Sequence, residues 1–461
     1  MSAPVHPAGL GAAQASLARV LERGALAALL AFVAWGPLAQ GSTFAGGRAG
    51  LAVLGTLSGG LWLASSVLAR QPGRALGSSW ALALLALLGW TGLSVALSPA
   101  PASAAPQGVL LVGVGLAALA AHGLLVTPER RVRFGLWLLG VAAVMAAYVV
   151  LQHLEGGFTL RADPAAASGF YYHPSHYAGF VTLALAVCGW AALDAPSRAA
   201  RVTGVVTGLI LAGSLLLTNS SSLPTALLAG AGALVVGVWR RWRRLGQVGA
   251  ALLLAGVGVG GWLLVTPAGH GTLDRLMGGI QTKTVDTFLT ERGKLWAMDA
   301  RAASAAPPTG VGPGHFVSFV TRFRPERAEG EHDLAFNFVN YAHNDYYQLA
   351  IELGWTGLAL YLALLLLTLA AAPAQDALGA ALLAGLVPLW ISGIWDSHAT
   401  VVPGTMAWAW VAGGAVVAAR RTRQRALAAA PAPRSPAPAR RPVPEGALRT
   451  ALPVVPGDPH D

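Results

Sequence analysis

The stretch that decides the fold is YAHNDYYQLAIELGWTG at Tyr341–Gly357, which continues without a break into the apolar segment Leu358–Ala372. The second segment is apolar enough to cross a membrane, and the first carries many polar and ionisable side chains. Exposed polar groups are costly at that depth, so such clusters face a water-filled or protein-lined cavity. An interfacial belt would account for Tyr346, Tyr347 and Trp355, but it does not require the neighbouring His, Asn, Asp, Gln and Glu. The stretch therefore predicts a functional site at the end of a membrane-spanning helix.

The composition of the whole chain is that of a polytopic membrane protein. Of its 461 residues, 55% are hydrophobic and 11% are charged, whereas a soluble globular chain carries about 25% charged residues. A net charge of +11 is common in nucleic-acid-binding proteins, but the arginines here fall in short connections between apolar stretches. We therefore expect no nucleic-acid partner. The single cysteine, Cys188, lies in an apolar run and provides neither a disulfide framework nor a cysteine metal site.

Windows of about 17–25 apolar residues identify membrane-spanning helices. They predict an all-α polytopic helix bundle of about 12 transmembrane helices, with one large loop that contains short helices. Gly and Pro interrupt several windows, which packing against neighbouring helices tolerates. The predicted spans are residues 24–40, 49–69, 79–98, 107–126, 134–152, 171–193, 202–218, 223–239, 247–266, 354–372, 376–395 and 399–419.

The arginines of the short connections collect on alternating sides of the predicted spans. The short loops on the other side carry only Arg48 and Arg161. By the positive-inside rule, this bias places both termini in the cytoplasm and residues 267–341 outside. The arginines on the predicted cytoplasmic side are Arg19, Arg23, Arg70, Arg74, Arg130, Arg131, Arg133, Arg198, Arg201, Arg240, Arg241, Arg243 and Arg244.

The same alternation divides the chain into five parts: a cytoplasmic N-terminal segment at 1–23, nine spans within 24–266, an outer loop with the catalytic segment at 267–353, three spans within 354–419, and a disordered basic tail at 420–461. Helical periodicity in the outer loop predicts a helix around Thr290–Ala305. The run Gly310–Gly314 lacks the Lys and Ser/Thr of a phosphate loop, so we predict a tight turn there.

The predicted topology gathers polar residues on the outer face. Arginine binds phosphate through a bidentate fork, and a histidine with a pKa near 6.5 accepts a hydroxyl proton at neutral pH. This combination fits the transfer of a group away from a lipid-linked phosphate without a metal. The residues concerned are His173, His176, Arg292, Lys294, Arg322, Arg324, His343, Asp396, Ser397 and His398.

Other roles are open for some of these residues. His173 and His176 could ligate a metal, but Pro174 between them gives poor helical geometry. They could also cap the sixth span and anchor it at the interface. His315, which follows the glycine turn, is expected to be solvated. We predict no metal ligands and no cofactor.

A helical reading of the polar stretch assigns roles to its side chains. Asn344, Gln348 and Glu352 would fall on one stripe at i, i+4 and i+8, where they can hydrogen-bond substrate or backbone. His343 would share a different face with Tyr346 and Tyr347. We therefore expect His343 to be the catalytic base and the stripe to bind substrate.

Three segments resemble the O-antigen ligase and polymerase superfamily, over roughly residues 165–400. The string His343-Asn344-Asp345-Tyr346-Tyr347-Gln348 with Glu352-Leu353-Gly354 resembles the family signature. Arg292–Trp296 with Pro308–Phe316 is similar to its upstream segment, and Gly169–Gly179 to an earlier element. The resemblance implies a multi-pass glycosyltransferase of the bacterial inner membrane. Such an enzyme moves a glycan from undecaprenyl diphosphate to a glycan or lipid acceptor at the periplasmic face, among membrane lipids and without a metal.

The resemblance also assigns residues and leaves three functions open. It implies catalytic roles for His343 and Arg292, with Arg322 and Arg324 as further diphosphate ligands. One function is a ligase that acts on lipid A-core, and another is a polymerase that extends repeat units on the same carrier. The third is a transporter, for which paired charges or helix breaks would be expected in two halves of the bundle. Polar residues here crowd one face instead, which favours an enzyme.

Overall fold

The computed structural model describes residues 7–70, 77–218, 228–236, 285–324, 340–371 and 376–429, with side chains between 11 and 420 except at 285–292. Every regular element in these ranges is helical, which confirms the all-α prediction. The chain divides into two units, Met1–Thr422 and Arg423–Asp461, and the first holds the elements that position the site. The helices are α1 (Pro7–Leu38), η1 (Gln40–Ser42), α2 (Ala45–Leu68), α4 (Ser79–Ala96), α5 (Pro101–Leu124), α6 (Pro128–Glu155), α7 (Pro174–Asp194), α8 (Arg198–Leu215), α12 (Val285–Ala305), α13 (Phe316–Val320), η2 (Thr321–Phe323), α14 (Asp345–Glu352), α15 (Gly354–Ala370), α16 (Ala377–Ser392) and α17 (Pro403–Ala429).

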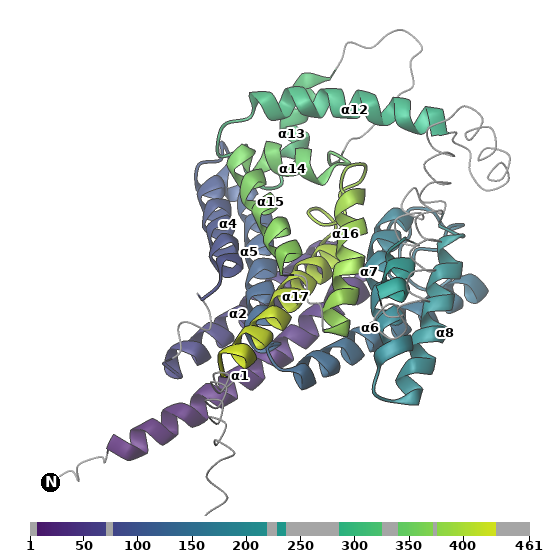
Figure 1. Ribbon diagram of the computed structural model, residues 1–461. Helices are drawn as coiled ribbons and strands as arrows, with labels where there is room; N and C mark the ends of the chain where they lie inside the picture. The colour runs from purple at the N-terminus through teal and green to yellow at the C-terminus, as the bar shows by residue number, and fades with distance from the viewer. Residues whose placement is uncertain are drawn as a thin grey trace, which may run out of the picture. The chain divides into compact units, whose positions relative to one another are not determined.

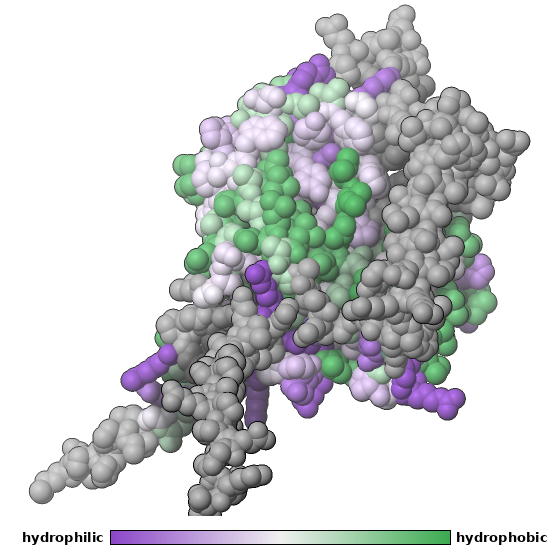
Figure 2. All heavy atoms as spheres, in the orientation of Figure 1, coloured by the Kyte–Doolittle hydropathy of each residue, from purple (hydrophilic) through white to green (hydrophobic). Residues whose placement is uncertain are grey.

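The predicted spans coincide with helices wherever the structure describes them. Five helices, α2, α4, α5, α6 and α7, are long and apolar enough to cross a membrane, and α15 and α16 are shorter apolar helices. The span expected at 247–266 lies outside the described residues. Figure 2 shows apolar residues gathered across the middle of the visible face, over α15 and α16. The protein is therefore a multi-pass membrane protein, and the count of twelve stays a prediction.

One face of α15 shows why this helix suits lipid. Trp355, Leu362, Leu366 and Leu369 are all exposed, and their spacing places them along one stripe of the helix. Tyr361, Leu364 and Thr368 on the other side are buried. A helix that is apolar on its exposed side as well as its buried side is typical of a bilayer environment.

The helices approach closely through small residues, and α17 lies at the centre of the packing (Figure 1). A Cβ on Gly404 of α17 would lie 2.6 Å from the carbonyl oxygen of Gly36 in α1. The indole of Trp408 donates a hydrogen bond to the carbonyl of Val33 at 2.7 Å, and its ring lies 4.8 Å from that of Phe180 in α7. Small residues of this kind let membrane helices pack backbone to backbone. The position of α17 ties α1 to α7.

Ion pairs form at the end of the bundle where α6 and α16 begin. Thr127 caps α6 by accepting a hydrogen bond from the Arg130 backbone N–H. The Arg130 side chain lies 2.5 Å from Glu22, and Arg131 lies 3.1 Å from Asp376 at the start of α16. These ion pairs join three segments at the arginine-rich end.

Candidate functional site

The helix α14 begins at Asp345, two residues later than a helical reading that includes His343 requires. Asn344 is its N-cap, and the side-chain Oδ1 accepts hydrogen bonds from the N–H groups of Tyr346 and Tyr347, both at 2.9 Å. Its Nδ2 donates to the carbonyl of Ile394 at 2.8 Å. Asparagine is among the strongest N-cap residues, so the helix starts after it. The expectation that His343 shares a helix face with Tyr346 and Tyr347 is wrong.

Asp345 fastens the first turn of α14 to the connection between α16 and α17. Its carboxylate is buried and accepts hydrogen bonds from the N–H groups of Ala399 at 3.2 Å and Thr400 at 3.1 Å, and from the Thr400 hydroxyl. The backbone N–H of Asp345 donates to the carbonyl of Gly393 at 2.7 Å. Burial raises the pKa of Asp345 to about 7, against the opposing effect of these hydrogen bonds. Asp345 is therefore a positioning residue of the fold.

The stripe predicted on α14 is bonded inside the protein. The Gln348 side chain accepts a hydrogen bond from the Ala342 N–H at 2.9 Å and donates to Glu352 Oε1 at 2.8 Å. Glu352 also accepts from the Phe316 N–H at 3.3 Å. Burial raises the pKa of Glu352 to about 7, although these hydrogen bonds act in the opposite direction. The sequence left two kinds of hydrogen-bond partner open for these side chains, substrate or backbone. The described contacts of Gln348 and Glu352 are with groups of the protein itself, and a role in substrate binding stays a prediction.

The glycine turn packs against the C-terminal end of α14. The N–H groups of Val311 and Gly312 donate to the carbonyls of Ile351 and Glu352, both at 3.0 Å, and satisfy groups that a helix end leaves unpaired. Gly310 has φ +75°, and a Cβ there would lie 2.2 Å from the carbonyl oxygen of Glu352. The tight turn predicted at Gly310–Gly314 is confirmed. Two motifs distant in sequence thus form one structural unit.

His315 has partners that its sequence position did not suggest. Its Nδ1 lies 3.0 Å from the Ser98 hydroxyl, and its Nε2 lies 2.6 Å from the Ser103 hydroxyl. Ser98 lies in the connection between α4 and α5, and Ser103 lies in the first turn of α5. The expectation that His315 is merely solvated is wrong, because this half-buried ring joins the glycine turn to that connection.

His343 lies between the α14 cap and the residues that follow α16. Its backbone has φ +48°, a left-handed conformation that is uncommon outside glycine and concentrates at functional sites. Its Nδ1 lies 3.5 Å from Asp396 Oδ1, and its side chain is 23% exposed. The ring of Tyr341 lies 4.2 Å from the His343 ring. A carboxylate on one side and an aromatic ring on the other orient this imidazole.

Four histidines gather around one acid, and we call His173, His176, His343 and His398 with Asp396 the histidine cluster. The Nε2 of His398 lies 3.5 Å from Asp396 Oδ2, so the two oxygens of one carboxylate face two imidazoles. The rings of His173 and His176 lie 5.3 Å apart. In this cluster the imidazoles, which can accept protons, surround the buried carboxylate of Asp396.

Three further contacts define the edges of the histidine cluster. His176 Nε2 lies 3.2 Å from the Tyr341 hydroxyl, which links α7 to the segment that carries His343. His398 packs on α7 at Gly179, where a Cβ would lie 2.7 Å from its Nδ1. His173 also caps α7 through its ring, which accepts from the Ser175 N–H at 3.2 Å. Within the described residues, no three His, Cys, Asp or Glu side chains are arranged to hold a metal ion.

The predicted cationic residues lie on the helices above α14. The helix α12, which confirms the helix expected at Thr290–Ala305, packs against α13, η2 and α14 (Figure 1). It carries Arg292, whose side chain lies outside the described residues, and the exposed Lys294. Arg322 is exposed, with its guanidinium 5.5 Å from the centre of the Phe319 ring, and Arg324 is also exposed. Lys294 lies on α12, which contacts α14, and Arg322 and Arg324 lie on or next to η2, which packs against α12 and α13.

Sequence reasoning placed Asp396 at this face without identifying its role. The signal was an acid in the run Trp395-Asp396-Ser397-His398, directly after an apolar span. An acid in such a place is costly unless it has a partner. The residues missed altogether are Tyr341 as a ring partner and Thr400 as a partner of Asp345.

Comparison with known families finds one match. The family model described as O-antigen ligase matches residues 206–362. The matched range begins in α8, includes α12, the glycine turn, His343 and α14, and ends in α15. No curated protein matches the chain.

Proposed function

The chain belongs to the O-antigen ligase superfamily through the domain at residues 206–362, and from this premise we propose that it is an O-antigen ligase-like glycosyltransferase. Its donor is a glycan carried on undecaprenyl diphosphate. Its acceptor is lipid A-core or a similar molecule at the periplasmic face of the bacterial inner membrane. The reaction uses residues of the chain itself, with no metal.

The observation that carries the proposal is the environment of His343. This imidazole lies outside α14, partly exposed, with Asp396 3.5 Å from its Nδ1. A base oriented by a third group is the arrangement that activates hydroxyl nucleophiles, and such contacts are often long before substrate binds. In the proposed step, His343 Nε2 takes the proton of the acceptor hydroxyl as that oxygen bonds to the anomeric carbon. The bond from that carbon to the diphosphate breaks, and the diphosphate leaves with the electron pair.

The leaving diphosphate requires positive charge beside the base. Arg292 and Lys294 on α12, with Arg322 and Arg324 near η2, are the residues that we assign to it. An arginine fork matches two phosphate oxygens at once. Fixed cations at the developing charge lower the barrier without reorganisation. The packing of α12 on α14 supports this assignment because it holds one helix of cations beside the segment that follows His343.

The proposed orientation puts the histidine cluster at the periplasmic face and the arginine-rich end in the cytoplasm, with both termini cytoplasmic and twelve spans. The ion pairs of Arg130 and Arg131 at the start of α6 support it, since arginines concentrate in cytoplasmic loops. Reporter fusions after Arg425 and within Glu326–Glu331 should give opposite signals. The same signal from both would mean that the number of spans between them is even.

The function is tested with purified protein in detergent and a purified lipid-linked glycan donor. A ligase transfers the glycan to the added lipid A-core acceptor and releases undecaprenyl diphosphate. A polymerase with the same donor is the alternative, because the family and its signature are shared. A deletion strain separates them: full-length polymer that accumulates on the carrier indicates a ligase, and single repeat units indicate a polymerase.

A further inference from the structure

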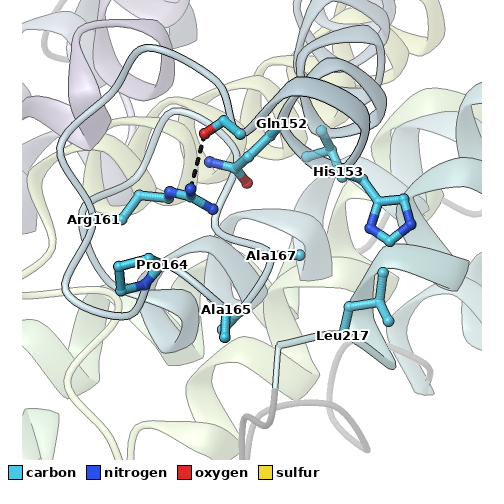
Figure 3. A pocket seen from close by; sticks show the side chains of 10 residues that line it. Gln152, His153, Arg161, Pro164, Ala165, Ala167 and Leu217 are labelled. Atoms are coloured by element: carbon cyan, nitrogen blue, oxygen red, sulfur yellow. Dashed lines mark hydrogen bonds between the residues drawn. The ribbon is translucent and has the colours of Figure 1, made fainter.

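A pocket of about 250 Å³ lies between the C-terminal end of α6, the loop before α7 and the end of α8 (Figure 3). Val149 and Leu217 form apolar parts of its wall, and Gln152, His153 and Arg161 supply polar groups. Figure 3 shows the Arg161 guanidinium directed toward the pocket, with His153 and Leu217 across from it. Among the described residues that line the pocket, Arg161 is the one with a fixed charge.

The loop that forms the pocket is held by hydrogen bonds on both sides. Gln152 Oε1 accepts from the N–H groups of Ser168 at 3.0 Å and Gly169 at 3.1 Å. The Tyr148 hydroxyl accepts from the N–H groups of Phe158 at 2.9 Å and Thr159 at 3.0 Å. These contacts fix the start and end of the loop to the last turns of α6. The pocket therefore exists before any ligand enters.

Exposed apolar residues alternate in the sequence with the residues that line the pocket. Leu154, Phe158 and Leu160 are 73%, 75% and 65% exposed, which is costly in water and favourable at the boundary of the acyl chains. An arginine among such residues keeps its charge at headgroup level while its stem lies along apolar surface. These exposed residues favour a position of the Arg161 loop at the membrane interface.

The electrostatics of the pocket depend on Arg161. It donates to the Gly156 carbonyl at 2.8 Å through Nη2, which engages one of its five N–H donors. The C-terminal end of α6 carries partial negative charge, which repels an anion. Arg161 covers a carbonyl of that end and adds a full positive charge beside it. Arg161 therefore opposes the repulsion of an anion by this helix end.

We propose that this pocket binds the phosphate of a membrane lipid headgroup at the outer face, with Arg161 as its main ligand. The lipid chains lie against Leu154, Phe158 and Leu160, the exposed apolar residues of the same segment. The backbone N–H of Ala162 donates to the Tyr172 carbonyl at 2.8 Å, so the Arg161 loop is bonded to the residue that precedes His173. A lipid phosphate in this pocket would bind to the loop that leads to His173. The proposal does not require that glycosyl transfer occurs.

The test is a fluorescence quenching measurement at Ala162, the residue next to Arg161. Ala162→Cys is labelled with bimane in the detergent-solubilised protein, where the buried Cys188 does not react. Phosphatidylglycerol with brominated chains should quench the label at lower concentration than a brominated neutral monoglucosyl diacylglycerol. Arg161→Gln should weaken quenching by phosphatidylglycerol about tenfold or more, because hydrogen bonds to a charged group are lost. Gln retains a donor for the Gly156 carbonyl, and the melting curve checks that the fold is unchanged.

Two controls decide the outcome. Arg198→Gln removes an exposed arginine at the start of α8 and should leave quenching unchanged. Arg161→Lys should recover part of the effect. Equal quenching by both lipids, or no change in Arg161→Gln, would overturn the proposal. Inorganic phosphate that competes as strongly as the lipid would also overturn it, because the site would then recognise free phosphate.

Discussion

At the C-terminal end of α14, Glu352 accepts hydrogen bonds from Gln348 and from the Phe316 N–H, and the glycine turn bonds the last carbonyls. At the N-terminal end, the side chains of Asn344 and Asp345 also form hydrogen bonds with groups of the protein itself. His343 lies just outside the cap, with its Nδ1 3.5 Å from Asp396 Oδ1. One motif therefore divides into residues that build the helix and one residue that the helix presents. Polar character alone did not distinguish them, whereas hydrogen-bond partners do.

The largest expected effect comes from removing the presented residue. His343→Ala should lower glycosyl transfer by about 100- to 10,000-fold, the usual contribution of a general base. Its side chain is partly exposed, so the melting temperature in detergent should change little and the donor should still bind. His315→Ala is the matched control, a loop histidine bonded to two serines, and should retain most turnover. Near wild-type transfer by His343→Ala would show that His343 is not the catalytic base and would leave His176 or His398 as the candidates.

The cations of α12 should give the next largest effect. Arg292→Ala should lose most transfer by our assignment, and Arg292→Lys should recover little, because a point charge does not replace a bidentate fork. Turnover with purified lipid-linked donor is the measurement. Arg275→Ala, in a part of the outer loop that we assign no role, is the control. If Arg292→Lys is fully active, Arg292 acts through general electrostatic attraction.

Asp396 should have an intermediate effect on chemistry. Asp396→Asn keeps the size of the side chain but removes the charge that favours a protonated imidazole. We expect transfer to fall roughly tenfold, as one pKa unit of lost stabilisation would give, and the acid limb of the pH–rate profile to move to lower pH. A purely structural role would lower the amount of folded protein without moving that limb. Asp194→Asn, at the exposed far end of α7, should change neither quantity.

The sequence predicted the helices well because apolar windows are local signals, and prolines and caps mark several starts, as at Thr127 and His173. It missed the start of α14 because helical periodicity was extended through Asn344, where N-cap preference dominates. The contact of His343 with Asp396 and the bonds of Asp345 to Thr400 join residues far apart in the chain. Such pairings depend on how α16 and α17 pack, and no local pattern contains that information.

A substitution that disturbs the C-terminal end of α14 should lower the stability of the protein and leave glycosyl transfer nearly unchanged. Gly310→Ala places a Cβ 2.2 Å from the Glu352 carbonyl oxygen at φ +75°, and we expect destabilisation on the order of 1–3 kcal/mol or more. Transfer per folded molecule should be nearly normal. Thermal unfolding in detergent, together with turnover per folded molecule, tests this. Gly140→Ala in α6, where a Cβ would meet nothing within 4 Å, is the control and should unfold at the wild-type temperature or slightly above it.

The smallest effect on transfer is expected at Asp345, whose influence should appear in the pH dependence of stability. Burial raises its pKa from 3.8 to about 7, so the folded state holds a proton that the unfolded state releases near pH 4. The stabilisation is complete below about pH 4, declines as the pH rises, and is lost through pH 7. Glu352, with its pKa raised to about 7, adds a decline of the same sign.

Asp345→Asn isolates this contribution, because the amide does not titrate while one oxygen still accepts from Thr400. The difference in melting temperature between the variant and the wild type should shift in favour of the variant from pH 4 to pH 7. The pH–rate profile per folded molecule should keep its wild-type shape, since Asp345 is one of the residues that build the helix α14. A profile that changes as in Asp396→Asn would place Asp345 with His343, and the division of the motif would then fall after Asp345 instead of after His343.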